Sequence, residues 1–313
     1  MTFRAVNKEA ELAAARPTDD FTRAFQSATL LAAARMRELF PVEHLERAIA
    51  LRNWMPYATD ARWRTVEGEL SEALEEAIRA KLAEAGDAEL RRLDRSPHTN
   101  EPDATLVRTT EPTIVVKVIT GRFDLRNPYS EDFVRRRGAA LVSGITGAAR
   151  QRIRDAIERG FVEGVPVRTT ARALRETLGL DDRLSRAVER QIRTMADAGS
   201  DDDAIESAAR AYADRLTAYR AETIARTETM TASNQGTLDS WRQAEREGLL
   251  PGGMKKRWIH ADGSSRTCPI CNELGDSDPV PVDEDFRSGV LGESFARPPA
   301  HPNCRCTVGL VRP

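Results

Sequence analysis

Cysteine is absent from the first 267 residues of this 313-residue chain, and only four cysteines follow. Every thiol therefore lies in the C-terminal part. Aromatic residues are also scarce, at 5% of the total, which favours a helical chain over a β-sandwich. No stretch approaches the roughly 18 consecutive apolar residues that a transmembrane helix requires. We therefore expect no membrane segment, and we look for a metal site near the C-terminus.

The first residues lack the apolar run of a signal peptide, so we expect synthesis in a host cytoplasm, where thiols stay reduced. Hydrophobic residues make up 40% and charged residues 31% of the chain, as in soluble globular proteins. The net charge of −2 excludes a global attraction to nucleic acid or anionic lipid. The length suffices for one large or two ordinary domains.

The pattern of residues divides the chain into four regions. We predict a helical region at 1–95, a linker with a strand at 96–129, a helical core at 130–250 and a β-rich module at 251–313. The strand is expected at Thr113–Ile119, a β-branched run. The predicted fold class is mainly α, with long helices in an elongated bundle and a small, zinc-binding C-terminal module.

Apolar residues at helical spacing support the predicted helices, and acidic or proline-containing segments mark their starts at Pro17–Asp20 and Asp201–Asp203. The buried faces are predicted to comprise Phe21, Phe25, Ala28 and Ala32; Val66, Leu70, Leu74 and Ile78; Val142, Ile145, Ala149, Ile153 and Ala156; and Ile205, Ala209, Tyr212, Leu216, Tyr219, Met230, Leu238 and Trp241. A break is expected at Pro56, among Trp54, Met55, Tyr57 and Trp63, and a helix end between Gly160 and Pro166 with a new start near Thr169.

The candidate functional site is formed by Cys268, Cys271, His301, Cys304 and Cys306. Zinc in proteins prefers four tetrahedral ligands from cysteine thiolates and histidine nitrogens. The C-x-x-C pair supplies two ligands from one turn, which leaves three donors for two positions. Because of this surplus, and because no H-x-E precedes Cys268 as it would in zinc deaminases, we predict a closed, structural zinc site. Cysteines without metal, either reduced or disulfide-bonded, and a catalytic metal remain alternatives.

Arg226-Thr227-Glu228 has residue types found in ADP-ribosyltransferase sites. Those groups come from separate strands, however, and three adjacent residues of one helix cannot reproduce their arrangement. We therefore expect Arg226 to pair with Glu222, one turn earlier, and to fix the long helix against its neighbours.

Arg135–Arg137 is predicted to be a solvated face, with an electrostatic contact to the DNA backbone as the alternative. The isolated histidines His44, His98 and His260 are predicted to be ordinary surface or packed residues. The acidic residues of Asp276–Asp285 could bind a cation but lack the order of an EF-hand.

One set of residues occurs in a characteristic order: Ile224-Ala-Arg-Thr-Glu228, Asn234, Trp241, Trp258, Cys268-x-x-Cys271, Phe286 and Pro298-Pro-Ala-His-Pro-Asn-Cys-Arg-Cys306. This combination resembles the phage Mu F-like minor head protein family, also called the phage head-morphogenesis domain. The resemblance covers roughly residues 130–310. The Ile-Ala-Arg-Thr-Glu helix and the His-Pro-Asn-Cys-Arg-Cys ending are specific together, although either alone would be weak.

The resemblance implies a non-enzymatic component of the virion of a tailed phage, prophage or gene-transfer particle, in the head interior or at the portal vertex. It implies the portal protein and major capsid or scaffold proteins as partners, and a role in head assembly, with DNA packaging or ejection as further roles. Packaged DNA is an additional, non-specific contact. Residues 1–95, which carry no site chemistry, are the expected docking region. The alternatives are a zinc-containing DNA-binding protein and an ADP-ribosyltransferase-like enzyme.

Overall fold

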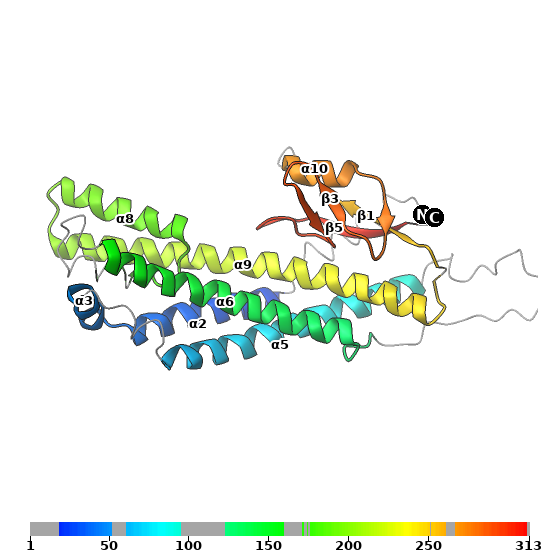
Figure 1. Ribbon diagram of the computed structural model, residues 1–313, viewed down its shortest axis with the longest axis horizontal. Coiled ribbons are helices and arrows are strands. Elements are labelled where there is room, and N and C mark those ends of the chain that lie inside the picture. Colours follow the sequence, from blue (N-terminus) through cyan, green and yellow to red (C-terminus); the bar gives the residue numbers. More distant parts are fainter. Residues whose placement is uncertain are drawn as a thin grey trace, which may run out of the picture. The chain divides into compact units, whose positions relative to one another are not determined.

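The computed structural model describes residues 19–51, 61–94, 123–159, 171, 174, 176–250, 252–260 and 267–311. Within these residues the helices are α2 (Asp19–Leu39), α3 (Val42–Ala50), α5 (Arg62–Asp94), α6 (Pro128–Arg159), α8 (Asp182–Asp197), α9 (Asp202–Arg246) and α10 (Pro269–Asp276) (Figure 1). The strands are β1 (Lys255–Ile259), β2 (Val280–Pro281), β3 (Phe286–Ser288), β4 (Glu293–Phe295) and β5 (Thr307–Val311). The predicted class, mainly helical with a small strand-containing C-terminal module, is confirmed.

Some predicted features lie outside the described residues: the helix start at Pro17–Thr18, the break around Pro56, the linker 96–112, the strand Thr113–Ile119, His98, and the helix boundary from Gly160 to Thr169. No helix among the described residues is long and apolar enough to cross a membrane. The chain forms two compact units. The helical unit comprises residues 22–77 and 135–225, and the mixed unit comprises residues 1–21, 78–134 and 226–313.

The core of the helical unit is built from aromatic and aliphatic side chains. The buried ones on α2, α3, α5 and the turn between α2 and α3 include Phe25, Met36, Phe40, Leu45, Ile49, Trp63, Val66, Leu70 and Leu74. The rings of Phe40 and Trp63 lie 5.0 Å apart. The Arg150 guanidinium lies 4.9 Å from the Trp63 ring centre and forms a 2.6 Å ion pair with Glu67. The predicted faces of α2 and α5 are therefore confirmed, apart from Phe21, which is only half-buried.

The first half of α9 buries a different face from the one predicted. Its buried residues recur every four positions and are small: Ala209, Ala213, Thr217, Ala221 and Ala225. The predicted stripe ran through Tyr212, Leu216 and Tyr219, but the first two are half-buried and Tyr219 is 49% exposed. Tyr219 is therefore a wrong prediction, because hydrophobic scoring favours large side chains while close helix packing here uses small ones. The start is as predicted, since the Asp201 carboxylate accepts a hydrogen bond from the Ala204 amide at 2.8 Å.

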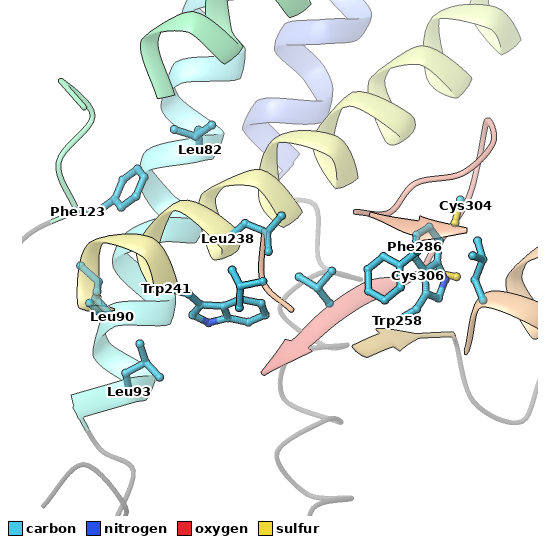
Figure 2. Close-up of a cluster of buried hydrophobic side chains, with 14 of the residues drawn as sticks. Leu82, Leu90, Leu93, Phe123, Leu238, Trp241, Trp258, Phe286, Cys304 and Cys306 are labelled. Atoms are coloured by element: carbon cyan, nitrogen blue, oxygen red, sulfur yellow. The ribbon is translucent and has the colours of Figure 1, made fainter. Parts of the chain in front are cut away.

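The mixed unit has a continuous core that joins α5, α9 and the C-terminal strands (Figure 2). Leu82 and Leu90 of α5 and Leu238 and Trp241 of α9 belong to the same buried cluster as Trp258 of β1. Two glycine positions permit close packing: a Cβ atom at residue 236 of α9 would lie 2.5 Å from the Leu82 carbonyl oxygen of α5, and one at residue 86 of α5 would overlap the ring of Phe123, which precedes α6. The Trp241 indole N–H donates to the Glu89 carboxylate at 2.6 Å.

The C-terminal strands form a three-stranded antiparallel sheet in the order β2–β1–β5 and a separate β3–β4 hairpin. In the sheet, Trp258 pairs with Val308 and Ile259 with Thr307. The Trp258 ring packs edge-on against Phe286 of β3, with ring centres 5.3 Å apart, which joins the hairpin to the sheet. We call residues 252–311 the C-terminal module.

Candidate metal centre

The first two cysteines are held by the start of α10. Cys268 is the N-cap residue, its sulfur accepts from the Cys271 amide at 3.4 Å, and Pro269 occupies the first turn, where its missing N–H costs nothing. Both sulfurs therefore project from one helical turn. Sequence patterning predicted a β-rich module and not this helix, because a cysteine is an uncommon N-cap and the helix has only eight residues.

The other three donors lie on the loop that leads into β5. The Cys304 amide donates to the His301 carbonyl at 3.2 Å, which closes a tight turn. Asn303, inside that turn, has a φ of 61°, a left-handed conformation that asparagine tolerates better than most residues. Strand β5 begins at Thr307, directly after Cys306. The turn thus reverses the chain and returns His301 and Cys304 toward α10.

The five donors meet in two overlapping groups that share Cys271. Cys268, Cys271 and His301 form one group, and Cys271, Cys304 and Cys306 form the other; within each group all donor atoms lie within 4.8 Å of one another. The His301 Nε2 atom is 3.2 Å from the Cys268 sulfur and 3.1 Å from the Cys271 sulfur, and the Cys271 and Cys304 sulfurs are 3.6 Å apart. Ligands of one tetrahedral ion at the usual zinc bond lengths are separated by roughly 3.5–3.8 Å, so the donor atoms here are about as close together as ligands of one ion, or slightly closer.

The His301 ring is oriented for metal binding. Its Nδ1 atom lies 2.9 Å from the Pro302 carbonyl oxygen, which fits an Nδ1–H donor. That tautomer leaves the Nε2 lone pair directed at the two α10 cysteines. All four cysteines are free thiols, and Cys271, Cys304 and Cys306 are buried. The disulfide alternative is therefore not the arrangement found in this structure.

The thiols of Cys271 and Cys304 are electrostatically coupled. The hydrogen bond to Cys304 raises the pKa of Cys271, and the hydrogen bonds from Cys271 and Cys306 lower the pKa of Cys304 to about 2. These hydrogen bonds favour the thiolate form at Cys304, and the thiolate is the form that ligates metal. With its donor atoms this close together, the cluster could hold a metal ion.

Helix α9 directly contacts the loop that carries His301, Cys304 and Cys306, which we call the Cys/His loop. The Thr227 hydroxyl oxygen accepts a hydrogen bond from the Asn303 amide at 3.1 Å. The Asn234 side chain donates to the Cys306 carbonyl at 3.2 Å and accepts from the Val308 amide at 3.1 Å. Sequence reasoning placed Thr227 and Asn234 in a characteristic motif but did not assign these contacts, because nothing local signals a partner more than seventy residues away.

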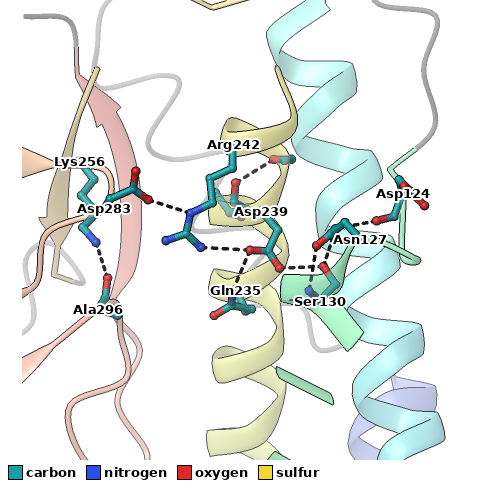
Figure 3. Close-up of polar contacts among 11 residues, drawn as sticks. Asp124, Asn127, Ser130, Gln235, Asp239, Arg242, Lys256, Asp283 and Ala296 are labelled. Atoms are coloured by element: carbon teal, nitrogen blue, oxygen red, sulfur yellow. Dashed lines mark hydrogen bonds and ion pairs between the residues drawn. The ribbon is translucent and has the colours of Figure 1, made fainter. Parts of the chain in front are cut away.

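A buried polar network adjoins this region on α9 (Figure 3). The Asp239 side chain, 1% exposed, accepts from the Ser130 hydroxyl at 2.8 Å, the Gln235 amide at 2.8 Å and the Arg242 guanidinium at 3.2 Å. Arg242 also pairs with Asp283 of the C-terminal module at 3.0 Å. The network therefore links α6, α9 and the module, and its partners compensate for the burial of the Asp239 charge.

Lys256 of β1 is a buried cation in the same part of the mixed unit (Figure 3). The residue is 1% exposed, its ammonium donates to the Ala296 carbonyl at 2.7 Å, and it lies 5.3 Å from the Phe286 ring centre. Burial, together with the nearby Arg242, lowers the pKa of Lys256 to about 8. Lys256 thus holds Ala296, in the segment that precedes the Cys/His loop.

The remaining sequence candidates lie away from the cluster or contribute no donor to it. Glu228 is buried and Arg226 half-buried on α9, and the expected Arg226–Glu222 pair stays a prediction. Arg135 and Arg136 are exposed on α6. His260 lies 3.9 Å from Asp276, at the limit of an ion pair. Among the described residues, the groups of three or more donors close enough for a metal ion are the two Cys/His groups, so the acidic residues of Asp276–Asp285 form none.

Comparison with known proteins supports the motif-based prediction. Residues 151–309 match the family described as Phage Mu protein F like protein, a segment that makes up half of the chain and includes all five donors. No curated protein and no solved structure matches significantly. The predicted resemblance to this family is thus confirmed over residues 151–309, a match that starts later than the predicted 130, and family membership indicates a phage head-morphogenesis protein. The chain belongs to the phage Mu protein F like family.

Proposed function

We propose that this protein is a minor, non-enzymatic head-morphogenesis protein that is incorporated into the phage head, in its interior or at the portal vertex. The observation that carries the proposal is that the family match includes both the α9 motif and the Cys/His loop, which contact each other through Thr227 and Asn234. The expected partners are the portal protein and major capsid or scaffold proteins. The expected role is head assembly, with DNA packaging or ejection as further roles.

In this proposal the Cys/His cluster holds a structural zinc ion. Candidate ligands are Cys268, Cys271, His301, Cys304 and Cys306, from which zinc would take four. The donors come from α10 and from the loop before β5, so the ion would join two segments that share no strand pairing. Such an ion contributes its binding free energy to folding, which suits a module of short elements.

We propose residues 1–95 as the docking region for the portal or capsid, and the four predicted regions remain our proposed division. The exposed face of α2 supports this assignment, because Leu30 and Leu31 are 37% and 51% exposed. Exposed apolar surface of this kind would be covered in a complex with another head protein.

Incorporation into heads tests the function. Phage heads purified from a lysate of the wild-type phage should contain the protein by mass spectrometry. A Leu30→Gln/Leu31→Gln variant should be depleted from heads, whereas Val290→Gln/Leu291→Gln, which removes an equally exposed apolar pair on the β3–β4 turn, should be retained. Absence of the wild-type protein from heads would overturn the proposal. Equal retention of both variants would remove α2 as the docking face.

A second candidate function, contact with packaged DNA, is favoured by the exposed face of α8. Leu184 and Val188 of α8 are buried against α9, and the opposite face carries Arg183, Arg186, Arg190 and Arg193, all exposed. Three acidic residues on α8 offset part of this charge, so we expect weak, sequence-independent binding.

Salt dependence tests this candidate. Binding of a short DNA duplex should weaken steeply between 50 and 200 mM salt, and each arginine that contacts a phosphate should contribute roughly one unit to the slope of log K against log salt. An Arg186→Gln/Arg190→Gln variant should lower that slope by about two. Binding that does not change with salt, or no binding at all, would eliminate DNA contact and leave the head-assembly role intact.

A further inference from the structure

Two polar side chains of α9, Thr227 and Asn234, hold the loop that carries His301, Cys304 and Cys306. They are seven residues apart, which places them two helical turns apart on one face, about 10.5 Å along the axis. We propose that Thr227 and Asn234 form a latch that couples metal occupancy of the Cys/His cluster to the docking of the loop and β5 on α9. The inference rests on the proposed metal site and assigns a role to the α9 motif.

Asn234 is the stronger half of the latch. The residue is 1% exposed, and its amide has no capacity left unused. Its oxygen accepts from the Val308 amide at 3.1 Å and the Thr307 hydroxyl at 3.0 Å, and its nitrogen donates to the Cys306 carbonyl at 3.2 Å and to the Met230 carbonyl at 2.9 Å. Only one orientation of the amide satisfies all four partners. Asn234 therefore fixes the two peptide groups on either side of Thr307.

Thr227 holds the middle of the loop. Its hydroxyl oxygen accepts from the Asn303 amide, and Asn303 is the left-handed residue between His301 and Cys304. The unfolded loop seldom adopts the left-handed conformation at this position. A hydrogen bond to the Asn303 amide therefore favours the turn that brings His301 and Cys304 together. Thr227 and Asn234 thus position the loop without providing a metal ligand.

The coupling follows from the shared loop. A metal ion would tie His301 and Cys304 to α10, while the latch ties Asn303 and Cys306 to α9, so both attachments favour one loop conformation. Two attachments that stabilise the same conformation strengthen each other, and the effect is reciprocal. Outer partners that orient metal ligands typically change metal affinity by about 10–100-fold when they are removed.

The decisive variant is Asn234→Asp. The carboxylate keeps the acceptor that faces Val308 but presents oxygen instead of N–H to the carbonyls of Cys306 and Met230. We expect zinc affinity, measured by competition with a chromogenic chelator, to fall by about 10–100-fold. After saturation with Co²⁺, the thiolate-to-cobalt absorption bands should match those of the wild type, because the ligands themselves are unchanged. Asn234→Ala should weaken zinc binding at least as much.

A matched pair of threonine variants separates the latch from general helix packing. Thr227→Val removes the acceptor for the Asn303 amide, whereas Thr231→Val, one turn later, removes a hydroxyl that donates only to the Thr227 carbonyl within α9. We expect Thr227→Val to weaken zinc binding several-fold and Thr231→Val to leave it unchanged. Equal effects of the two variants would mean that α9 packing, and not the latch, sets affinity.

Hydrogen exchange supplies the reciprocal measurement. In the wild-type protein, zinc should slow exchange of the Asn303 and Val308 amides, and in Asn234→Asp the zinc-dependent slowing should shrink. Zinc binding by the wild type with unchanged affinity in Asn234→Asp would overturn the latch alone. Failure of the wild type to bind zinc, Co²⁺ or another divalent ion would overturn the proposed metal site together with the latch.

Discussion

The helical unit and the C-terminal module bury different kinds of side chain in elements of very different length. In the helical unit, long helices such as α2, with 21 residues, bury large side chains such as Phe25 and Met36 completely. In the C-terminal module the longest element is α10, with eight residues, and the longest strands have five. Three of the four cysteines are among its buried residues.

This difference indicates two sources of stability. Long amphipathic helices remove enough apolar surface from water to offset the entropy of ordering the chain. Short strands and an eight-residue helix bury much less each, so the module relies on the core that it shares with α5 and α9 and also on polar attachments. These are the Cys/His cluster, the contacts of Thr227 and Asn234, and the Arg242–Asp283 ion pair. We therefore expect the two regions to respond to different perturbations.

The largest expected effect comes from removing metal. Zinc binding contributes on the order of 10 kcal/mol in small structural zinc domains, so stripping the ion should unfold the C-terminal module. A strong chelator should abolish the hydrogen-exchange protection of the β1 and β5 amides while the core of the helical unit stays protected. Cys271→Ser should reproduce the result, because Cys271 belongs to both groups of donors.

Cys306→Ser is the control for this experiment, since zinc takes only four of five donors. The zinc content of the purified variant shows whether the Cys306 sulfur is dispensable. Simultaneous loss of hydrogen-exchange protection in both regions after chelation would contradict the two separate sources of stability, because the helical unit would then depend on the ion.

The second effect concerns the helical unit. Leu74 is fully buried on α5, and Leu74→Ala removes apolar contacts and leaves a cavity, at a cost of about 2–5 kcal/mol. We expect a lower urea midpoint for the helical signal with an unchanged zinc content. A loss of zinc from Leu74→Ala would show that the two regions do not fold independently.

How far the sequence predicts the structure also differs between the two regions. The four-residue rhythm of Val66, Leu70 and Leu74 identifies the buried face in the first half of α5, because each buried residue from Trp63 to Ile78 is apolar. Spacing likewise brings the five donors to one place, since C-x-x-C and His-x-x-Cys pairs each fit one turn. The buried polar residues of α9, Asn234 and Asp239, were not predictable as buried, because hydrophobic periodicity treats polar residues as exposed.

The third effect isolates the buried cation of the module. The pKa of Lys256 is about 8 in the folded protein, against 10.5 for the unfolded chain. Between these values the unfolded state binds more protons, so the free energy of unfolding should rise with pH from about 8 to 10.5, by up to about 3 kcal/mol. Below pH 8 the full cost of burying the charge is present.

Lys256→Met should therefore flatten this rise and be neutral or stabilising at pH 7, because the exposed Ala296 carbonyl that it leaves behind can bind water. Lys255→Met, at the exposed neighbouring position of β1, is the matched control and should keep the wild-type slope. Urea unfolding of the zinc-loaded proteins at several pH values provides the measurement. If the free energy of unfolding rises equally with pH in Lys256→Met and in the wild type, Lys256 is not the cause of this pH dependence.

The smallest effect tests how much the left-handed conformation of Asn303 contributes to the shape of the Cys/His loop. At a φ of 61°, Asn303→Ala places a Cβ atom in a left-handed conformation that costs roughly 1–2 kcal/mol, whereas Asn303→Gly tolerates it. If the loop owes its shape to attachments on α9 and α10, the alanine variant should still fold and bind zinc about tenfold more weakly. Its loss of stability should not exceed the cost of this strain. The glycine variant should stay within a few-fold of the wild type. Weaker zinc binding by glycine than by alanine would mean that loop flexibility, and not left-handed strain, dominates at Asn303, because glycine adds entropy to the unfolded loop while alanine adds only the clash.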